Sequence, residues 1–283
     1  MRTNPIFSNA LLFGAWFSVG LLILIAVFMV LRSWPFFDRE GLGALWLDSN
    51  WFPTEGSFNL LPMVAGSLMV TLGAVLLAGP TGVILAIFGR YYAPARLASV
   101  YRALMELLSG IPSVVYGFWG LLVLVPWISS FAPPGASISA GIIVLAIMVL
   151  PLVVLTVDTS FEQTPKKWLV AADALALQRW SKVWRIVLPA SLPSILSGIT
   201  LQTGRALGET MAVLMVCGNI VQVPGSIFDP ARTLTANIAL EMSYASGLHV
   251  NALFVSGLLL FILTVVIVKF GGLIQEGTRR QGA

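Results

Sequence analysis

The sequence has few of the residues that most often carry chemistry. It contains one cysteine, Cys217, and one histidine, His249, among 283 residues. A single cysteine excludes an intrachain disulfide, and one residue of each type excludes a Cys/His metal cluster. Packing accounts for Cys217, and His249 is expected in a loop. No Gly-Lys-Ser or Gly-Lys-Thr sequence occurs, which excludes the phosphate-cradling loop of an ATPase. We therefore expect no catalytic residue, metal or cofactor in this chain.

Charge is also scarce. Charged residues make up 10% of the chain and hydrophobic residues 58%, whereas a soluble domain carries about 25% charged residues. The mean hydropathy is +0.92. This composition predicts an all-α integral membrane protein. A net charge of +4 would suggest nucleic acid as the partner of a soluble protein, but in a membrane protein basic residues orient the loops.

Long uncharged runs predict six transmembrane helices, because a spanning helix needs about 20 apolar residues. The run from Leu107 to Val157 is too long for one crossing and is divided at Pro133-Pro134-Gly135. A cleaved signal peptide is the alternative for the first run, but its apolar region is too long and we expect a retained helix. The predicted spans are 11–31, 63–88 with a bend at Pro80, about 104–129, 138–157, 191–217 and about 250–270.

The basic residues predict the orientation. The N-terminus, residues 90–103, residues 158–189 and the C-terminus together hold 12 Lys and Arg, and the opposite side holds Arg32, Arg39 and Arg232. By the positive-inside rule both termini are cytoplasmic, and the basic balance needs no nucleic acid. We divide the chain into residues 1–62, the first helix and an external loop whose tryptophans suit a membrane interface; residues 63–271, the main membrane domain; and a cytoplasmic tail, 272–283.

Two ionisable residues, Arg205 and Glu209, interrupt the fifth predicted span. They are four residues apart, so a continuous helix would place them on one face, where they can pair. Arg205 would lie roughly 18 Å along the helix from Pro193, near the middle of a hydrocarbon layer about 30 Å thick. Charges at that depth face a bundle interior or a water-filled path. We expect both residues, with Thr210, to line a translocation path; a structural ion pair is the alternative.

Two further segments carry sequence signals. In Ser109-Gly110-Ile111-Pro112-Ser113, glycine and proline weaken the third helix, either as irregular backbone that lines a path or as a packed kink. The polar segment 158–189 contains Thr164-Pro165, a good helix start. An apolar stripe follows at helical spacing, and it could lie on the lipid surface or dock to a partner. Its members are Trp168, Ala171, Ala172, Leu175, Val183 and Val187.

The same segment resembles the coupling-loop signature of ABC importer permeases. The signature reads Glu-Ala-Ala, three residues, Gly, nine residues, Ile-x-Leu-Pro. The chain keeps this spacing with Ala171-Ala172, then Ala176 after three residues, then Ile186 to Pro189 after nine residues. Val170 stands at the glutamate position and Ala176 at the glycine position. The resemblance implies a short helix between Trp168 and Leu177 that docks into an ATPase. The residues it assigns to coupling are Ala171, Ala172, Leu175, Ala176, Leu188 and Pro189.

Three blocks look more specifically like phosphate importer permeases of the PstC type. They are GRALGETMAVLMVCGN at 204–219, SGIPSVVYG at 109–117 and TLTANIALEM at 233–242. The resemblance implies the MetI-like fold of six transmembrane helices in the bacterial inner membrane, and it implies that Arg205 and Glu209 serve transport. The implied partners are a second permease of the PstA type, a dimer of PstB-type ATPase subunits and an external PstS-type phosphate-binding protein. Residues 220–249 would contact that binding protein or only cap the bundle.

The expected function is import of inorganic phosphate, driven by ATP hydrolysis in a separate subunit. Arginine suits this role because its fork of donors matches phosphate oxygens and stays charged when desolvated. Two alternatives remain open. The anion could be sulfate or molybdate, since an arginine alone does not choose among oxyanions. The chain could instead be an ion-coupled secondary carrier with Glu209 as its proton-coupling group.

Overall fold

The computed structural model describes residues 5–48 and 50–281, almost all of them helical. The described chain forms two compact units, Met1–Leu60 with Ile238–Phe261, and Leu61–Asn237 with Ile262–Ala283. The first unit holds α1 (Pro5–Arg39), α2 (Ala44–Leu47), β1 (Trp51–Phe52), the 3-10 turn η1 (Pro53–Glu55) and β2 (Ser57–Phe58). Two helices, α12 (Leu234–Glu241) and α13 (Leu248–Gln281), contribute residues to both units.

The first unit has an aromatic cluster that packs at a two-stranded hairpin. Strands β1 and β2 pair antiparallel, with Trp51 opposite Phe58. The ring centroid of Phe58 lies 5.1 Å from that of Phe36 and 6.1 Å from that of Trp51, edge to face in both cases. All three side chains are buried. Trp51 is thus a core residue, which corrects the expectation that it lies at a membrane interface; Trp34 is exposed.

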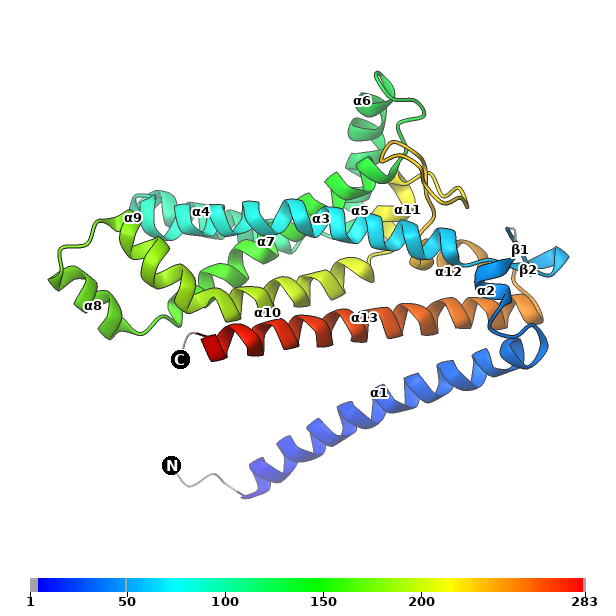
Figure 1. Cartoon of the computed structure of the whole chain (residues 1–283), viewed down its shortest axis with the longest axis horizontal. Helices are drawn as coiled ribbons and strands as arrows, with labels where there is room; N and C mark the ends of the chain where they lie inside the picture. The colour runs from blue at the N-terminus through cyan, green and yellow to red at the C-terminus, as the bar shows by residue number, and fades with distance from the viewer. Residues whose placement is uncertain (1–4, 49, 282–283) are drawn as a thin grey trace. The chain divides into compact units, whose positions relative to one another are not determined.

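The second unit is built on α3 (Leu61–Ile87) and α7 (Ile138–Glu162), which pack side by side along most of their length (Figure 1). Glycines allow the close approach: a Cβ added at Gly82 would lie 2.6 Å from Cγ1 of Val153. The other elements of this unit are η2 (Phe88–Tyr92), α4 (Ala95–Ser109), α5 (Ser113–Trp119), η3 (Gly120–Leu124), α6 (Val125–Ser129), α8 (Lys166–Ala174), α9 (Arg179–Lys182), η4 (Val183–Val187), α10 (Leu188–Leu207) and α11 (Met211–Val216). The η2, η3 and η4 segments are single π-helical turns.

Five helices of the described chain are long and apolar enough to cross a membrane, and the count becomes six if the bent pair 95–109 and 113–129 forms one span. The six predicted spans are therefore confirmed in number, with shifted ends. Helix α4 begins at Ala95, so residues 95–103, predicted as a loop, are helical. The helix expected to end near Phe270 continues to Gln281.

Two predicted helices are broken. The third predicted span bends by 92° between α4 and α5. The fifth, predicted as one helix from 191 to 217, ends at Leu207 and restarts at Met211. Both breaks contain glycine, which is about 1 kcal/mol less favourable than alanine in a helix interior. Hydropathy alone could not reveal them, because it averages over the residues on both sides of each break.

The contact between α3 and α7 can be tested with two glycines three residues apart. Gly82→Ala should lower the free energy of unfolding by about 1–3 kcal/mol, because the added Cβ meets Val153 and overpacking costs that much. Gly79→Ala should be neutral or slightly stabilising, since its added Cβ finds its nearest neighbour at 3.7 Å. Titration with a denaturing detergent, followed by far-UV circular dichroism, measures both. Equal effects would contradict the packing described here.

Candidate functional site

Arg205 and Glu209 lie on different segments. Arg205 is exposed in the last turn of α10. The backbone N–H of Gly208 donates to Gly204 O at 3.3 Å and that of Glu209 to Ala206 O at 3.2 Å, which ends the helix. Among the residues that the structure describes, no ion pair joins Arg205 to Glu209. The predicted pairing on one helical face is therefore wrong in this conformation, because the helix stops between the two residues.

Glu209 is partly buried beside a very small polar cavity. The cavity has a volume of about 10 Å³, enough for about one water molecule. Thr235 Oγ1 donates to the backbone oxygen of Glu209 at 3.0 Å. The hydroxyl-bearing residues that line the cavity with Glu209 are Ser67, Thr71, Thr233 and Thr235. Glu209 is therefore set in a polar pocket within the second unit.

Thr210 braces the break itself. Its Oγ1 donates to Gly208 O at 3.3 Å, and its backbone oxygen accepts from Leu214 N at 2.9 Å in the first turn of α11. Its side chain is partly exposed. The three predicted path residues are thus brought into one short stretch, at the end of one helix and the start of the next.

The bend between α4 and α5 places α5 against α11. Tyr116 Oη donates to Leu108 O at 2.9 Å across the bend, and the Tyr116 side chain is buried. A Cβ added at Gly117 would lie 2.8 Å from Cα of Ala212, so the backbones of α5 and α11 approach closely there. The bend is therefore a packed one, and it also positions the helix that follows Thr210.

A groove continues from the Arg205 face of α10. It has a volume of about 730 Å³ between α7, α10 and the last part of α13. Residues 194, 197, 201 and 205 share one face of α10, and the first three line the groove. Its hydroxyl-bearing residues are Thr156, Thr159, Ser160, Ser194, Ser197 and Thr200. Sequence reasoning missed this groove; the helical spacing of Ser and Thr in both segments was the signal.

The segment with the signature spacing, residues 158–189, contains the predicted helix, α8, which begins at Lys166 after Pro165. Val170 is 67% exposed and Leu175 73% exposed, whereas Ala172 is 1% exposed. Ala171 and Ala176 are exposed, Pro189 is exposed and Leu188 is partly buried. Apolar side chains on an exposed short helix suit a protein contact, and Ala172 belongs to the packing beneath it.

Helix α8 ends in a Schellman motif at the signature glycine position. Leu177 N donates to Ala172 O at 3.1 Å and Ala176 N to Asp173 O at 2.9 Å, the two bonds that define the motif. Ala176 has a φ of +51°, in the left-handed region that costs a residue with a Cβ about 1–2 kcal/mol. The signature has glycine at this position because the backbone there is left-handed, and Ala176 is strained in its place.

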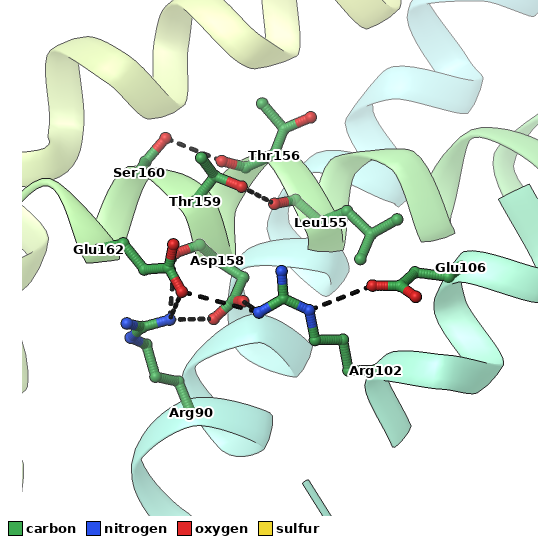
Figure 2. Close-up of polar contacts among 9 residues, drawn as sticks. All are labelled: Arg90, Arg102, Glu106, Leu155, Thr156, Asp158, Thr159, Ser160 and Glu162. Carbon is green, nitrogen blue, oxygen red and sulfur yellow. Dashed lines mark hydrogen bonds and ion pairs between the residues drawn. The ribbon is translucent and has the colours of Figure 1, made fainter. Parts of the chain in front are cut away.

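A network of charged residues, which sequence reasoning missed, ties the end of α7 to α3 and α4 (Figure 2). Arg90 Nη1 lies 2.8 Å from Asp158 Oδ1 and 3.2 Å from Glu162 Oε1. Arg102 Nη1 lies 3.3 Å from Asp158 Oδ2 and 3.7 Å from Glu162 Oε1. Arg102 Nε also pairs with Glu106 on its own helix at 3.2 Å. The four interhelical partners line a cavity of about 660 Å³.

In the first unit, Glu241 is buried between two aromatic partners. Its Oε2 accepts from Trp51 Nε1 at 2.8 Å and lies 2.8 Å from His249 Nε2. His249 is the second residue of α13, which corrects its assignment to a loop. Cys217 is buried, as expected of a packing residue. Among the residues that the structure describes, no group of three or more His, Cys, Asp and Glu side chains could hold a metal ion.

The chain belongs to a known transport family. The family described as "Binding-protein-dependent transport system inner membrane component" matches residues 78–279, and membership implies an ATPase and a binding protein as partners. With its candidate spans, the chain is a multi-pass protein of the bacterial inner membrane.

The similar curated proteins point to one branch of the family. The phosphate transport system permease protein PstC of Pasteurella multocida is 32% identical, over 95% of this chain and 90% of its own. PstC of Mesorhizobium japonicum is 33% identical, over 86% and 81%. The probable ABC transporter permease protein YqgH of Bacillus subtilis is 36% identical, over 87% and 82%.

Solved structures share the fold. An inward-facing MetNI methionine ABC transporter matches with a TM-score of 0.61 at 19% identity, over 77% of this chain and 95% of that one. A bacterial alginate ABC transporter matches with a TM-score of 0.66 at 14% identity, over 94% of both chains. The fold is therefore that of a MetI-like ABC importer permease.

The strain at Ala176 gives a prediction. Ala176→Gly should stabilise the end of α8 by about 1 kcal/mol, somewhat less than the left-handed strain removed because glycine loses more freedom on folding. Hydrogen exchange at the amides of residues 176 and 177 should then slow about fivefold. Ala171→Gly, the same change inside α8, should speed it instead. Equal exchange in wild type and Ala176→Gly would show that the position carries no strain.

Proposed function

We propose that this chain is the transmembrane permease subunit of an ATP-driven importer that carries inorganic phosphate from an external binding protein into the cytoplasm. The observation that carries this proposal is the similarity over most of the chain to proteins named as phosphate transport permeases. The geometry of Arg205 supports it, since this exposed residue at a helix end shares a face of α10 with Ser194, Ser197 and Leu201, which line a groove that carries hydroxyl groups. The chain itself is non-catalytic, and a separate subunit hydrolyses ATP.

Arg205 is the residue we assign to contact with phosphate. Its planar fork of donors can bind two phosphate oxygens at once and cannot be deprotonated. Glu209 acts as an intermittent counter-ion, because the break at Gly208 lets α10 and α11 bring the two groups together or apart. Such a site binds an anion strongly enough to admit it and weakly enough to release it. Thr210 holds the break in register.

The partners we propose follow the branch of the family. Helix α8 docks into one subunit of a PstB-type ATPase dimer through its exposed apolar side chains, with Leu175 among them. A second, PstA-type permease completes the pathway as a heterodimer partner. A PstS-type protein delivers phosphate on the external side. We assign both termini to the cytoplasm because Lys and Arg are in excess in residues 90–103, in residues 158–189 and at the chain ends.

The role of Arg205 is tested by Arg205→Gln in the assembled importer. Loss of charge-assisted hydrogen bonds, worth about 1.5–3 kcal/mol, should lower phosphate uptake at least tenfold while the partner subunits still co-purify. Arg96→Gln, which removes an exposed arginine from the first turn of α4, is the matched control and should transport normally. Uptake of labelled phosphate into proteoliposomes measures both.

Three other results of that assay would count against the proposal. Unchanged uptake with Arg205→Gln in an intact complex would remove Arg205 from the path. Uptake of labelled sulfate or molybdate in preference to phosphate would assign a different oxyanion. Uptake that continues without the ATPase and collapses with an uncoupler would assign a secondary carrier.

Docking of α8 is tested by cross-linking. A cysteine at Leu175, 73% exposed, should form an adduct with the ATPase subunit, whereas a cysteine at Ala172, 1% exposed, should not. The native Cys217 is buried and can stay in place. Gel shifts with and without ATP reveal the adduct. No adduct from Leu175→Cys under any nucleotide condition would place α8 at the lipid surface instead.

A further inference from the structure

We propose that Arg90, Arg102, Asp158 and Glu162, here called the α7 clamp, form the joint that transmits movement of α8 to the segment carrying Glu209. The inference rests on the proposed function, in which an ATPase moves α8. It assigns positioning roles to four residues that sequence reasoning did not single out.

The clamp joins three helices at one level. Asp158 and Glu162 are four residues apart in the last two turns of α7, so they share a face. Arg90 comes from the π-helical turn η2 that ends α3, and Arg102 from the middle of α4. Each carboxylate pairs with both arginines, as Figure 2 shows. A cross-connected network resists sliding of one helix past another better than a single pair does.

The place of the clamp next to α8 makes it a coupling element. Glu162 is the last residue of α7, and only 163–165 separate it from the first residue of α8. The same linker is anchored to α10, because Thr164 Oγ1 and Ser191 Oγ lie 3.2 Å apart and both side chains are buried. Displacement of α8 therefore arrives at two points, the clamp and the first turn of α10.

Each point leads to one of the two charged path residues. Helix α10 runs from the Thr164 anchor to Arg205. From the clamp, α4 runs to the bend, where Tyr116 ties α5 to Leu108, and α5 packs on α11 through Gly117. Helix α11 follows directly after Glu209 and Thr210. Arg205 and Glu209 are thus moved by separate connections. When the two connections move by different amounts, the distance between the two charges changes.

The partial exposure of the clamp residues favours a role in coupling helix movements over a role in folding stability. The Asp158 and Arg90 side chains are 18% and 28% exposed, and those of Glu162 and Arg102 are 47% and 52% exposed. Exposed ion pairs contribute little to folding stability, so loss of the Glu162 carboxylate, at a side chain 47% exposed, leaves a folded chain. The clamp is well placed to define how three helix ends move together.

The test measures coupling in the complete importer with its binding protein, reconstituted in proteoliposomes. Asp158→Asn removes two of the four interhelical pairs, and Glu162→Gln, at a more exposed position, removes the other two. We expect both variants to keep the ATPase subunit and to hydrolyse ATP, while phosphate imported per ATP hydrolysed falls at least tenfold. Glu106→Gln is the matched control, because it removes only the pair of Arg102 within α4, and its ratio should stay within twofold of wild type.

A covalent link provides the rescue. In the double variant Arg102→Cys, Asp158→Cys, a short bifunctional thiol reagent should restore the ratio of phosphate to ATP that the unlinked double variant has lost. Wild-type ratios in Asp158→Asn or in Glu162→Gln, or an equal loss in Glu106→Gln, would overturn the clamp. If phosphate uptake and ATP hydrolysis fall together, so that the ratio of phosphate to ATP is unchanged, the clamp has only a structural role. Failure of the wild-type chain to retain any ATPase would instead refute the proposed function.

Discussion

The contact between α5 and α11 is the interaction on which both broken helices depend. Within a bilayer, backbone that leaves a helix is tolerated only where protein or a water-filled cavity satisfies it. Here Gly117 brings α5 close to Ala212, and Gly120, the first residue of η3, lies close to Val216. The contact buries Tyr116 and Gly117 in α5 and Ala212, Val213 and Val216 in α11, and the Tyr116 hydroxyl donates to Leu108 O across the bend. The contact thus joins the segment that follows the 92° bend to the segment that follows the break at Gly208.

This arrangement changes the meaning of the Arg205 and Glu209 pair. A continuous helix would fix the two charges at one distance, as a strut does. Placing a helix end between them leaves Arg205 exposed and Glu209 beside a cavity large enough for about one water molecule. A charge whose counter-ion is on another segment is available to an anion in some conformations and neutralised in others. The proposed role of Arg205 uses that property, and an unbroken helix cannot supply it.

The sequence was sufficient for the features that depend on local pattern. Long apolar runs gave the spans, and Thr164-Pro165 gave the start of α8 within one residue. Features that depend on tertiary contact were missed. The α7 clamp joins residues 68 and 56 positions apart, and no local spacing predicts such pairing. Trp51 and Glu241 are buried against each other although they are 190 residues apart in the sequence.

The groove beside Arg205 shows how hydroxyls can line a path without trapping an anion. Thr156, Thr159, Ser160 and Thr200 each donate their hydroxyl hydrogen to the carbonyl four residues earlier in their own helix. Such back-bonding is a common state of Ser and Thr within helices, and it leaves the oxygen lone pairs to face the groove. Lone pairs hold water and offer an anion no hydrogen-bond donor. Under the proposed function, these four hydroxyls offer no second strong site to an anion that leaves Arg205, and release of the ion requires that.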